Sequence, residues 1–134
     1  MSDAAIEAAQ AKWRRKEHRD MPEAEVQRRL EAALRRAGYL VMHIRDARAQ
    51  NLTGFPDVVA LHADGRLFVA ECKTERGKTT VMQDRWLVRF ATHAGWCPPA
   101  AMRVCLVRPS TLAEVERDIL GMSEEEEGNG NGTD

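Results

Sequence analysis

The sequence lacks any apolar run long enough to cross a membrane, because no stretch reaches 18 consecutive apolar residues. Its first residues are charged and rich in alanine, and no apolar segment of the kind found in secretion signals follows them. We therefore expect a cytoplasmic protein that has no membrane partner.

Cysteine is also scarce, and its three positions show no metal-binding spacing. Cys72, Cys97 and Cys105 form neither a Cys-x-x-Cys pair nor a cysteine–histidine zinc pattern, so we expect reduced thiols. The sequence has no glycine-rich loop of the P-loop or dinucleotide-binding type and no internal repeat. These absences point away from zinc proteins, nucleotide-binding enzymes and repeat proteins.

Charge is almost balanced over the whole chain, with 20 basic and 21 acidic residues and a net charge of −1. Five of the acidic residues lie in the segment 123–134, which contains no base. Without that segment the chain has 20 bases against 16 acids, a net charge of +4. This mildly basic balance is compatible with a nucleic-acid partner but does not by itself establish one.

The length of 134 residues predicts a single domain. We expect it to span residues 21–122, with residues 1–20 as an N-terminal arm, helical or disordered, and residues 123–134 as an acidic disordered tail. The arm contains Trp13 among basic residues, which fits a contact with a phosphate backbone and stacking of the indole on a base. A frayed terminus or a contact with another protein molecule is the simpler interpretation.

Apolar spacing predicts a mixed sheet flanked by helices. Val26, Leu30 and Leu34 repeat at the interval of a buried helical stripe, and Gly38 is placed to end that helix. An Asp64-Gly65 pair between two apolar runs indicates a β-hairpin. We expect helices over 22–37, 80–93 and 109–120 and strands over 39–45, 58–61, 67–72 and 102–108.

This hairpin carries acidic and basic side chains that we expect to lie close together. Side chains alternate along a strand, so Glu71 and Lys73 point to the same face, and strand pairing places Asp57 beside Glu71. Two carboxylates and an ammonium group are costly to bury without a ligand, and a divalent cation such as Mg²⁺ prefers carboxylate oxygens. Taken singly, each residue also has an ordinary role, as a loop-end cap or a surface ion pair.

The pattern of Pro56-Asp57 followed by Glu71-Cys72-Lys73 resembles the PD-(D/E)XK nuclease superfamily. More narrowly, Gly54-Phe-Pro-Asp57, Glu71-x-Lys73, Gly77 and Gln83 resemble the VRR-NUC family of small, often phage-encoded nucleases, over about residues 21–108. The resemblance implies an α/β fold of the restriction-endonuclease-like type, an αβββαβ core with a mixed central sheet flanked by helices. If a phage encodes the chain, the resemblance also implies that the protein is located in the cytoplasm of a bacterial host cell.

The resemblance assigns roles to the hairpin residues. It implies that Asp57 and Glu71 bind Mg²⁺, with Mn²⁺ able to substitute, and that the backbone carbonyl of Cys72 is a further ligand. Lys73 would orient a water molecule or neutralise developing charge. The Cys72 side chain would then lie in the core.

Two helical residues complete the implied catalytic set. Glu23 lies on the apolar stripe of its helix, whereas Glu25 lies on the opposite face, so Glu23 matches the helix glutamate of the family. Glu23 also has an ordinary interpretation, as a first-turn acid that the helix dipole favours. Gln83 matches the family glutamine that reaches the site. It also fits a capping box with Thr80, and we do not expect one amide to serve both roles fully.

The remaining candidates are DNA contacts. Arg45 and Arg48, in the loop before the hairpin, have guanidinium groups that match phosphate oxygens, although solvated loop arginines would have the same pattern. His43, near the end of the first strand, is either a structural histidine or a substrate contact. Arg76 and Lys78 lie in the turn after the hairpin.

Together these features predict a Mg²⁺-dependent DNA endonuclease that hydrolyses phosphodiester bonds. The resemblance further implies a homodimer that acts on branched DNA such as four-way (Holliday) junctions. One alternative is a nuclease of another DNA structure, of the restriction or nicking type. The others are a non-cleaving nucleic-acid-binding module with the same fold and a small interaction protein that acts through its arm and tail.

Overall fold

The structure is a computed structural model, and it describes residues 2–43 and 52–130. The helices and strands follow one another in the predicted order, and the N-terminal arm forms a helix. In chain order the elements are α1 (Asp3–Asp20), α2 (Glu23–Arg36), β1 (Tyr39–His43), β2 (Val58–His62), β3 (Leu67–Cys72), α3 (Val81–Ala94), β4 (Met102–Val107) and α4 (Pro109–Gly130).

The strands form one mixed sheet in the order β1-β2-β3-β4. β2 is antiparallel to both of its neighbours, β1 and β3, and Val58 of β2 lies opposite Ala70 of β3. β4 is parallel to β3, with Val104 opposite Val69, because α3 carries the chain back along the sheet. The predicted hairpin turn is present, and Gly65 has a φ of 94°, a conformation that favours glycine.

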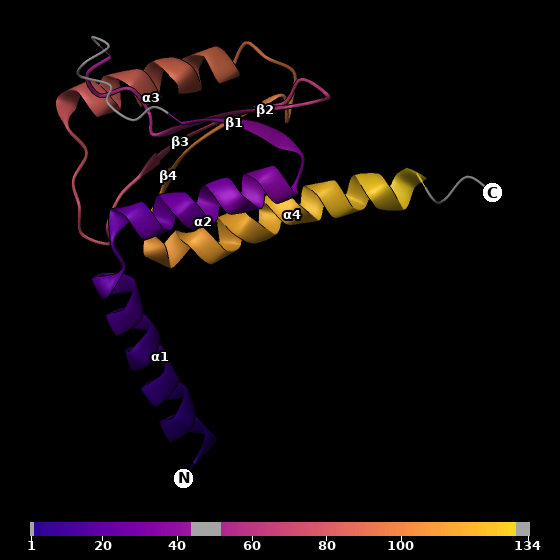
Figure 1. Ribbon diagram of the computed structural model, residues 1–134. Helices are drawn as coiled ribbons and strands as arrows, with labels where there is room; N and C mark the ends of the chain where they lie inside the picture. The colour runs from indigo at the N-terminus through magenta and orange to yellow at the C-terminus, as the bar shows by residue number, and fades with distance from the viewer. Residues whose placement is uncertain (1, 44–51, 131–134) are drawn as a thin grey trace.

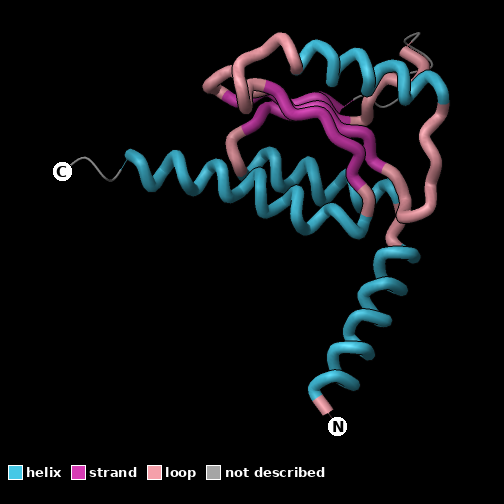
Figure 2. The backbone as a smooth tube through the Cα atoms, turned by 180° about the vertical axis from the view of Figure 1, so that it is seen from behind, coloured by secondary structure: helices cyan, strands magenta, loops and turns pink. Residues whose placement is uncertain are grey.

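Helices cover both faces of this sheet. α2 and α4 lie side by side on one face, and α3 crosses the other face (Figure 1). The view from behind shows the same three layers (Figure 2). The predicted restriction-endonuclease-like arrangement, a mixed sheet flanked by helices, is therefore confirmed.

The core lies between the sheet and the α2–α4 layer. The predicted stripe of α2 is confirmed, because Leu30 is fully buried, and Leu112 of α4 is 1% exposed in the same core. Phe68 and Cys72 of β3 pack into the same core. By contrast, none of the residues of α3 is buried, so the sheet face under α3 is covered less completely.

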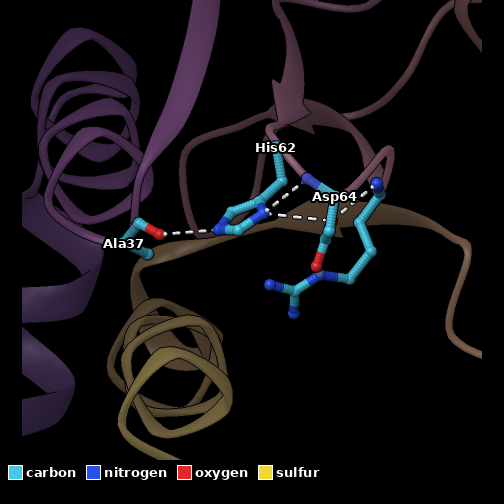
Figure 3. Close-up of polar contacts among 4 residues, drawn as sticks. Ala37, His62 and Asp64 are labelled. Carbon is cyan, nitrogen blue, oxygen red and sulfur yellow. Dashed lines mark hydrogen bonds and ion pairs between the residues drawn. The ribbon is translucent and has the colours of Figure 1, made fainter. Parts of the chain in front are cut away.

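A histidine fastens the hairpin to the end of α2 (Figure 3). Nε2 of His62 lies 3.2 Å from the backbone oxygen of Ala37, which only accepts, so this nitrogen carries the hydrogen. Nδ1 then accepts a hydrogen bond of 3.2 Å from the backbone N–H of Asp64. These contacts hold the turn end of the hairpin, and Asp57 and Glu71 lie at the opposite end.

The last helix is longer than the sequence predicts. The expected end at residue 120 is wrong, because α4 continues to Gly130, into the segment for which a disordered tail is predicted. The residues after Gly121 include four glutamates, which favour a helix, against Gly121, Gly128 and Gly130, each of which costs about 1 kcal/mol in a helix interior. Residues 131–134 lie outside the described residues.

α1 stands apart from the three layers. It projects away from the sheet, and none of its residues is buried (Figure 1). The side chain of Ser2 caps its N-terminus by accepting a hydrogen bond of 3.2 Å from the backbone N–H of Ala5. The N-terminal arm is thus a regular helix, and neither it nor any other described helix is long and apolar enough to cross a membrane.

Candidate active site

Pairing of β2 with β3 brings the two hairpin carboxylates together. Because Val58 lies opposite Ala70, Asp57 and Glu71 form the next pair of the register and share one face. Oδ2 of Asp57 accepts a hydrogen bond of 2.9 Å from the backbone N–H of Cys72. This bond fixes the orientation of the Asp57 carboxylate relative to β3.

Glu71 is the most buried acid of the site, with 1% of its surface exposed. Its Oε1 accepts a hydrogen bond of 2.9 Å from Nε2 of Gln83. Its Oε2 has no hydrogen-bond partner within the described residues. Burial, and then the negative charge of Asp57, raise the pKa of Glu71 from 4.5 to about 8. A buried carboxylate oxygen without a partner is costly, so this oxygen is where a bound cation would be favourable.

Glu23 reaches the same point from the first turn of α2. Ligand oxygens of Glu23, Asp57 and Glu71 all lie within 4.8 Å of one another. Burial and then the charge of Asp57 raise the pKa of Glu23, whereas the ammonium group of Lys73 lowers it. The structure thus places Glu23 with the hairpin carboxylates, on the side that its helical position predicts, and Glu25 is not part of this cluster.

Lys73 follows β3 and is two residues beyond Glu71. Its backbone N–H donates a hydrogen bond of 3.0 Å to the carbonyl oxygen of Val107, which continues the pairing with β4. The positive charge of its side chain lowers the pKa of Glu71 and Glu23, against the effect of burial. The ammonium group is therefore close enough to both carboxylates to balance part of their charge.

Gln83 serves the helix and the site at once. Its Oε1 accepts a hydrogen bond of 2.8 Å from the backbone N–H of Thr80, which completes the capping box of α3. Its Nε2 donates to Glu71 at 2.9 Å. The expectation that one amide cannot serve both roles is wrong, because the carbonyl end accepts and the amino end donates.

Gly54 sets the distance between the loop before Asp57 and the start of α3. It has a φ of 79°, and a Cβ at this position would lie 2.6 Å from the carbonyl carbon of Met82 and 2.8 Å from the backbone nitrogen of Gln83. The neighbouring Phe55 packs edge-on against the ring of Trp86, with ring centroids 5.0 Å apart. Glycine is therefore required for this close approach.

The acidic cluster has the chemistry of a divalent-cation site. It offers carboxylate oxygens, which Mg²⁺ and Mn²⁺ prefer, and the unpartnered oxygen of Glu71 fits such an ion. The Cys72 thiol is not part of it, because that side chain is fully buried in the core and burial raises its pKa. The carbonyl of Cys72 stays a predicted ligand.

Only part of the predicted DNA-contact set lies within the described residues. Arg76 and Lys78 are exposed in the turn that leads from β3 to α3. His43 ends β1, but its side chain lies outside the described structure, and so do Arg45 and Arg48 altogether.

Sequence reasoning missed Arg108, which follows β4 and organises this turn. Nη1 of Arg108 donates hydrogen bonds to the backbone oxygens of Thr74, at 2.8 Å, and Gly77, at 2.6 Å. The carboxylate of Glu75 accepts a further bond of 3.0 Å from the backbone N–H of Ser110. A lone arginine after a strand gives no sequence signal for this role, because its three acceptors are backbone oxygens.

The fold and the site together define a nuclease of the PD-(D/E)XK type, in which a hairpin presents two carboxylates and a lysine on a mixed sheet. The family model for archaeal Holliday junction resolvases (Hjc) matches residues 22–128, so the chain belongs to that family. No curated protein and no solved structure matches the chain. The matched range includes every residue of the acidic cluster and leaves α1 outside.

Proposed function

We propose that this protein is a Mg²⁺-dependent endonuclease that cleaves branched DNA, with the four-way junction as its substrate. The observation that carries the metal dependence is the buried Oε2 of Glu71, which has no hydrogen-bond partner in the described ranges. Its carboxylate lies next to those of Asp57 and Glu23. Membership of the Holliday junction resolvase family supports the junction as the substrate.

Glu23, Asp57 and Glu71, with the backbone carbonyl of Cys72, would hold the cation, and Mn²⁺ would substitute for Mg²⁺ because both accept oxygen ligands. A bound divalent cation supplies a water of lowered pKa and counter-charge for the phosphoryl oxygens. The structure supports this assignment through the close approach of the three carboxylates.

The other residues of the site position and balance this chemistry. The ammonium group of Lys73 would offset the negative charge that develops on the phosphoryl group in the transition state. Gln83 holds Glu71 in place through the bond from Nε2. The Cys72 backbone N–H does the same for Asp57. These groups belong to separate helices and strands. The folded chain therefore holds them in place in the absence of substrate.

We also infer a homodimer. On the sheet face away from α2 and α4, Leu40 and Leu61 lie opposite each other in the register and are 82% and 52% exposed. Met42, on the same face of β1, is 57% exposed. A cluster of large exposed apolar side chains on an edge strand and the strand beside it is typical of a protein contact. A second copy of the chain would cover it, and sedimentation as a monomer at micromolar concentration would contradict the inference.

The narrower relation to the VRR-NUC family is part of the same proposal. Two of the residues that carry the resemblance, Gly54 and Gln83, make specific contacts in the structure. Gly54 allows the close approach to α3, and Gln83 reaches Glu71 from the first turn of that helix. These contacts support the relation, which rests on the residues rather than on the family match.

The test is cleavage of a labelled four-way junction beside linear duplex and single-stranded DNA, with Mg²⁺, Mn²⁺ or EDTA. We expect the wild type to cut the junction with either metal and not in EDTA. Lys73→Ala and Glu71→Gln should lose cutting, by a factor on the order of 10² to 10³ or more, and retain junction binding.

Each other outcome changes a specific part of the proposal. Cutting in EDTA would remove the metal requirement. Cutting of linear duplex in preference to the junction would indicate a restriction or nicking type of nuclease. Binding of all DNAs without cutting by the wild type would leave a non-cleaving binding module with this fold.

A further inference from the structure

A groove of about 700 Å³ lies between α1 and the turn that follows β3. Both backbone views show this loop reaching the C-terminal end of α1 (Figure 1 and Figure 2). Most of the charged side chains that line the groove are basic. They are Lys12, Arg15, Lys16 and Arg19 of α1 and Arg76 of the turn, with Glu75 as the acid.

α1 presents this charge together with an exposed indole. Ala9, Lys12, Trp13 and Lys16 are spaced by three and four residues, so they lie on one face of the helix, and all four line the groove. Trp13 is 65% exposed, and no residue of α1 is buried. Packing against a core therefore does not explain the indole, whereas a partner that takes both a flat ring and positive charge would explain it.

The groove adjoins the candidate active site at both of its walls. Arg19 precedes Glu23 by four residues, and Arg76 follows Lys73 by three. A chain segment of four residues spans at most about 14 Å. A DNA strand that leaves the site in this direction would therefore reach the groove within about four nucleotides.

The wall formed by the turn is fixed before any partner binds. Arg108 donates to three backbone oxygens of the turn, the shortest bond being 2.6 Å to Gly77. The carboxylate of Glu75 is occupied by the backbone N–H of Ser110 at 3.0 Å. The one acid of the groove is thus already hydrogen-bonded, and Arg76 is presented from a fixed backbone.

We propose that α1 and the turn at Arg76 form a second DNA-binding surface, which holds the phosphate backbone of the strand leaving the active site. Trp13 stacks on a base that is unpaired at the branch point. The family match begins at residue 22, so the helical half of this surface is a feature that the family assignment does not account for. The proposal rests on the proposed function for the identity of the substrate.

The experiment measures binding of the four-way junction in EDTA as a function of salt concentration, so that no cleavage is needed. The groove variant is Lys16→Ala/Arg19→Ala, and the matched control is Arg36→Ala/Arg117→Ala, which removes the same charge at exposed positions that do not line the groove. Each lost phosphate contact lowers the slope of log K against log salt by about 0.9, so we expect a loss of about 2 for the groove variant only.

A closer pair of variants separates position from charge. Arg14 and Arg15 are neighbours on α1, and only Arg15 lines the groove. Arg15→Ala should reduce the salt slope by about 1, whereas Arg14→Ala should leave it unchanged. Equal slopes for the groove and control variants, or no junction binding by the wild type, would overturn the proposal.

Stacking has its own readout in tryptophan fluorescence. The chain has three tryptophans, and Trp96 is 86% exposed outside the groove. Junction DNA should quench the wild type and Trp96→Phe, and most of this quenching should be absent in Trp13→Phe. Undiminished quenching in Trp13→Phe would overturn the assignment of Trp13.

The outcomes also distinguish this proposal from the proposed function. If the wild type cuts the junction but the groove variants bind it with unchanged slopes, the second surface is wrong and the nuclease stands. If the slopes change as expected but no DNA is cut with any metal, the surface stands and the endonuclease activity is wrong.

Discussion

Gln83 donates a hydrogen bond of 2.9 Å to Glu71, and this bond joins the first turn of α3 to β3 of the sheet. The carbonyl end of the same amide closes the capping box with Thr80. The start of the helix and the position of the buried acid therefore depend on one side chain. A variant that weakens the helix cap but keeps the bond to Glu71 separates the effect on stability from the effect on catalysis.

Thr80→Ala removes the hydroxyl that accepts a hydrogen bond from the backbone N–H of Gln83, and it keeps the bond between the Gln83 side chain and Glu71. We expect it to lower the free energy of unfolding by about 1 kcal/mol and to change the cleavage rate less than twofold. Gln83→Leu removes both bonds of the Gln83 side chain, to the backbone of Thr80 and to Glu71. It should lower the cleavage rate by about 10- to 100-fold at a similar loss of stability. Urea unfolding and single-turnover junction cleavage measure the two quantities, and equal rate losses would show that Gln83 acts only through the helix.

The raised pKa of Glu71 makes the stability of the metal-free protein depend on pH. Burial and the charge of Asp57 raise this pKa from 4.5 to about 8, so the folded state binds a proton that the unfolded state releases between these values. The stabilisation that this proton gives to the folded state is therefore fully present below about pH 4.5 and is lost as the pH rises to about 8. It is on the order of a few kcal/mol.

Glu71→Gln is the control for this effect, because the amide keeps the shape of the side chain and does not titrate. Urea unfolding in EDTA between pH 5 and pH 8 should show falling stability for the wild type and a much flatter profile for the variant. A parallel decline in both proteins would assign the pH dependence to other groups.

Gly54 and Gly65 form a matched pair for testing close packing at the site. Both have positive φ, of 79° and 94°, but a Cβ would meet the backbone of Met82 at 2.6 Å in one case and nothing within 4 Å in the other. Gly65→Ala should cost about 1 to 2 kcal/mol from backbone strain alone. Gly54→Ala should cost more and should also slow cleavage, because it displaces the start of α3. Thermal unfolding and cleavage rates that are the same for both variants would contradict the role of Gly54.

Arg108→Lys tests the brace of the turn. Lysine keeps the charge but has no nitrogen in the position of Nη1, the single guanidinium nitrogen that donates to all three backbone oxygens, so we expect a loss of about 1 to 3 kcal/mol in stability. The backbone amide of Gly77, which bonds to Thr74 at 3.3 Å, should also exchange faster with solvent. Arg103→Lys is the control, because Arg103 makes a half-exposed ion pair with Asp118 at 3.5 Å. Equal exchange rates at Gly77 in both variants would remove Arg108 from the turn.

Much of the fold could be predicted from local patterns. The stripe containing Leu30, the glycine after α2 and the Asp64-Gly65 turn each have a signal within a few residues, and the structure confirms them. The end of α4 was not predictable in this way. Gly121 and the glutamates after it have opposing preferences, and a small energy difference decides between them.

The candidate site was predictable where strand geometry decides it. Alternation along β3 and pairing with β2 are enough to place Asp57 beside Glu71. Contacts between distant segments gave no such signal. The approach of Gly54 to Met82, the bonds of Arg108 and the groove beside α1 all depend on how helices dock on the sheet, which no local spacing encodes.

The three carboxylates come from different parts of the chain: the start of α2, the residue before β2 and the strand β3. No single helix or hairpin can therefore form the site by itself, and a partly unfolded chain would lose the ion. A ligand whose free concentration is 100 times its dissociation constant stabilises the folded state by about 2.7 kcal/mol. In a hydrogen-exchange experiment a bound ion would slow those amides that exchange through openings that break the site, and local fraying of α1 would continue unchanged. Mg²⁺ would thus act as a reporter of the cooperativity of the whole domain.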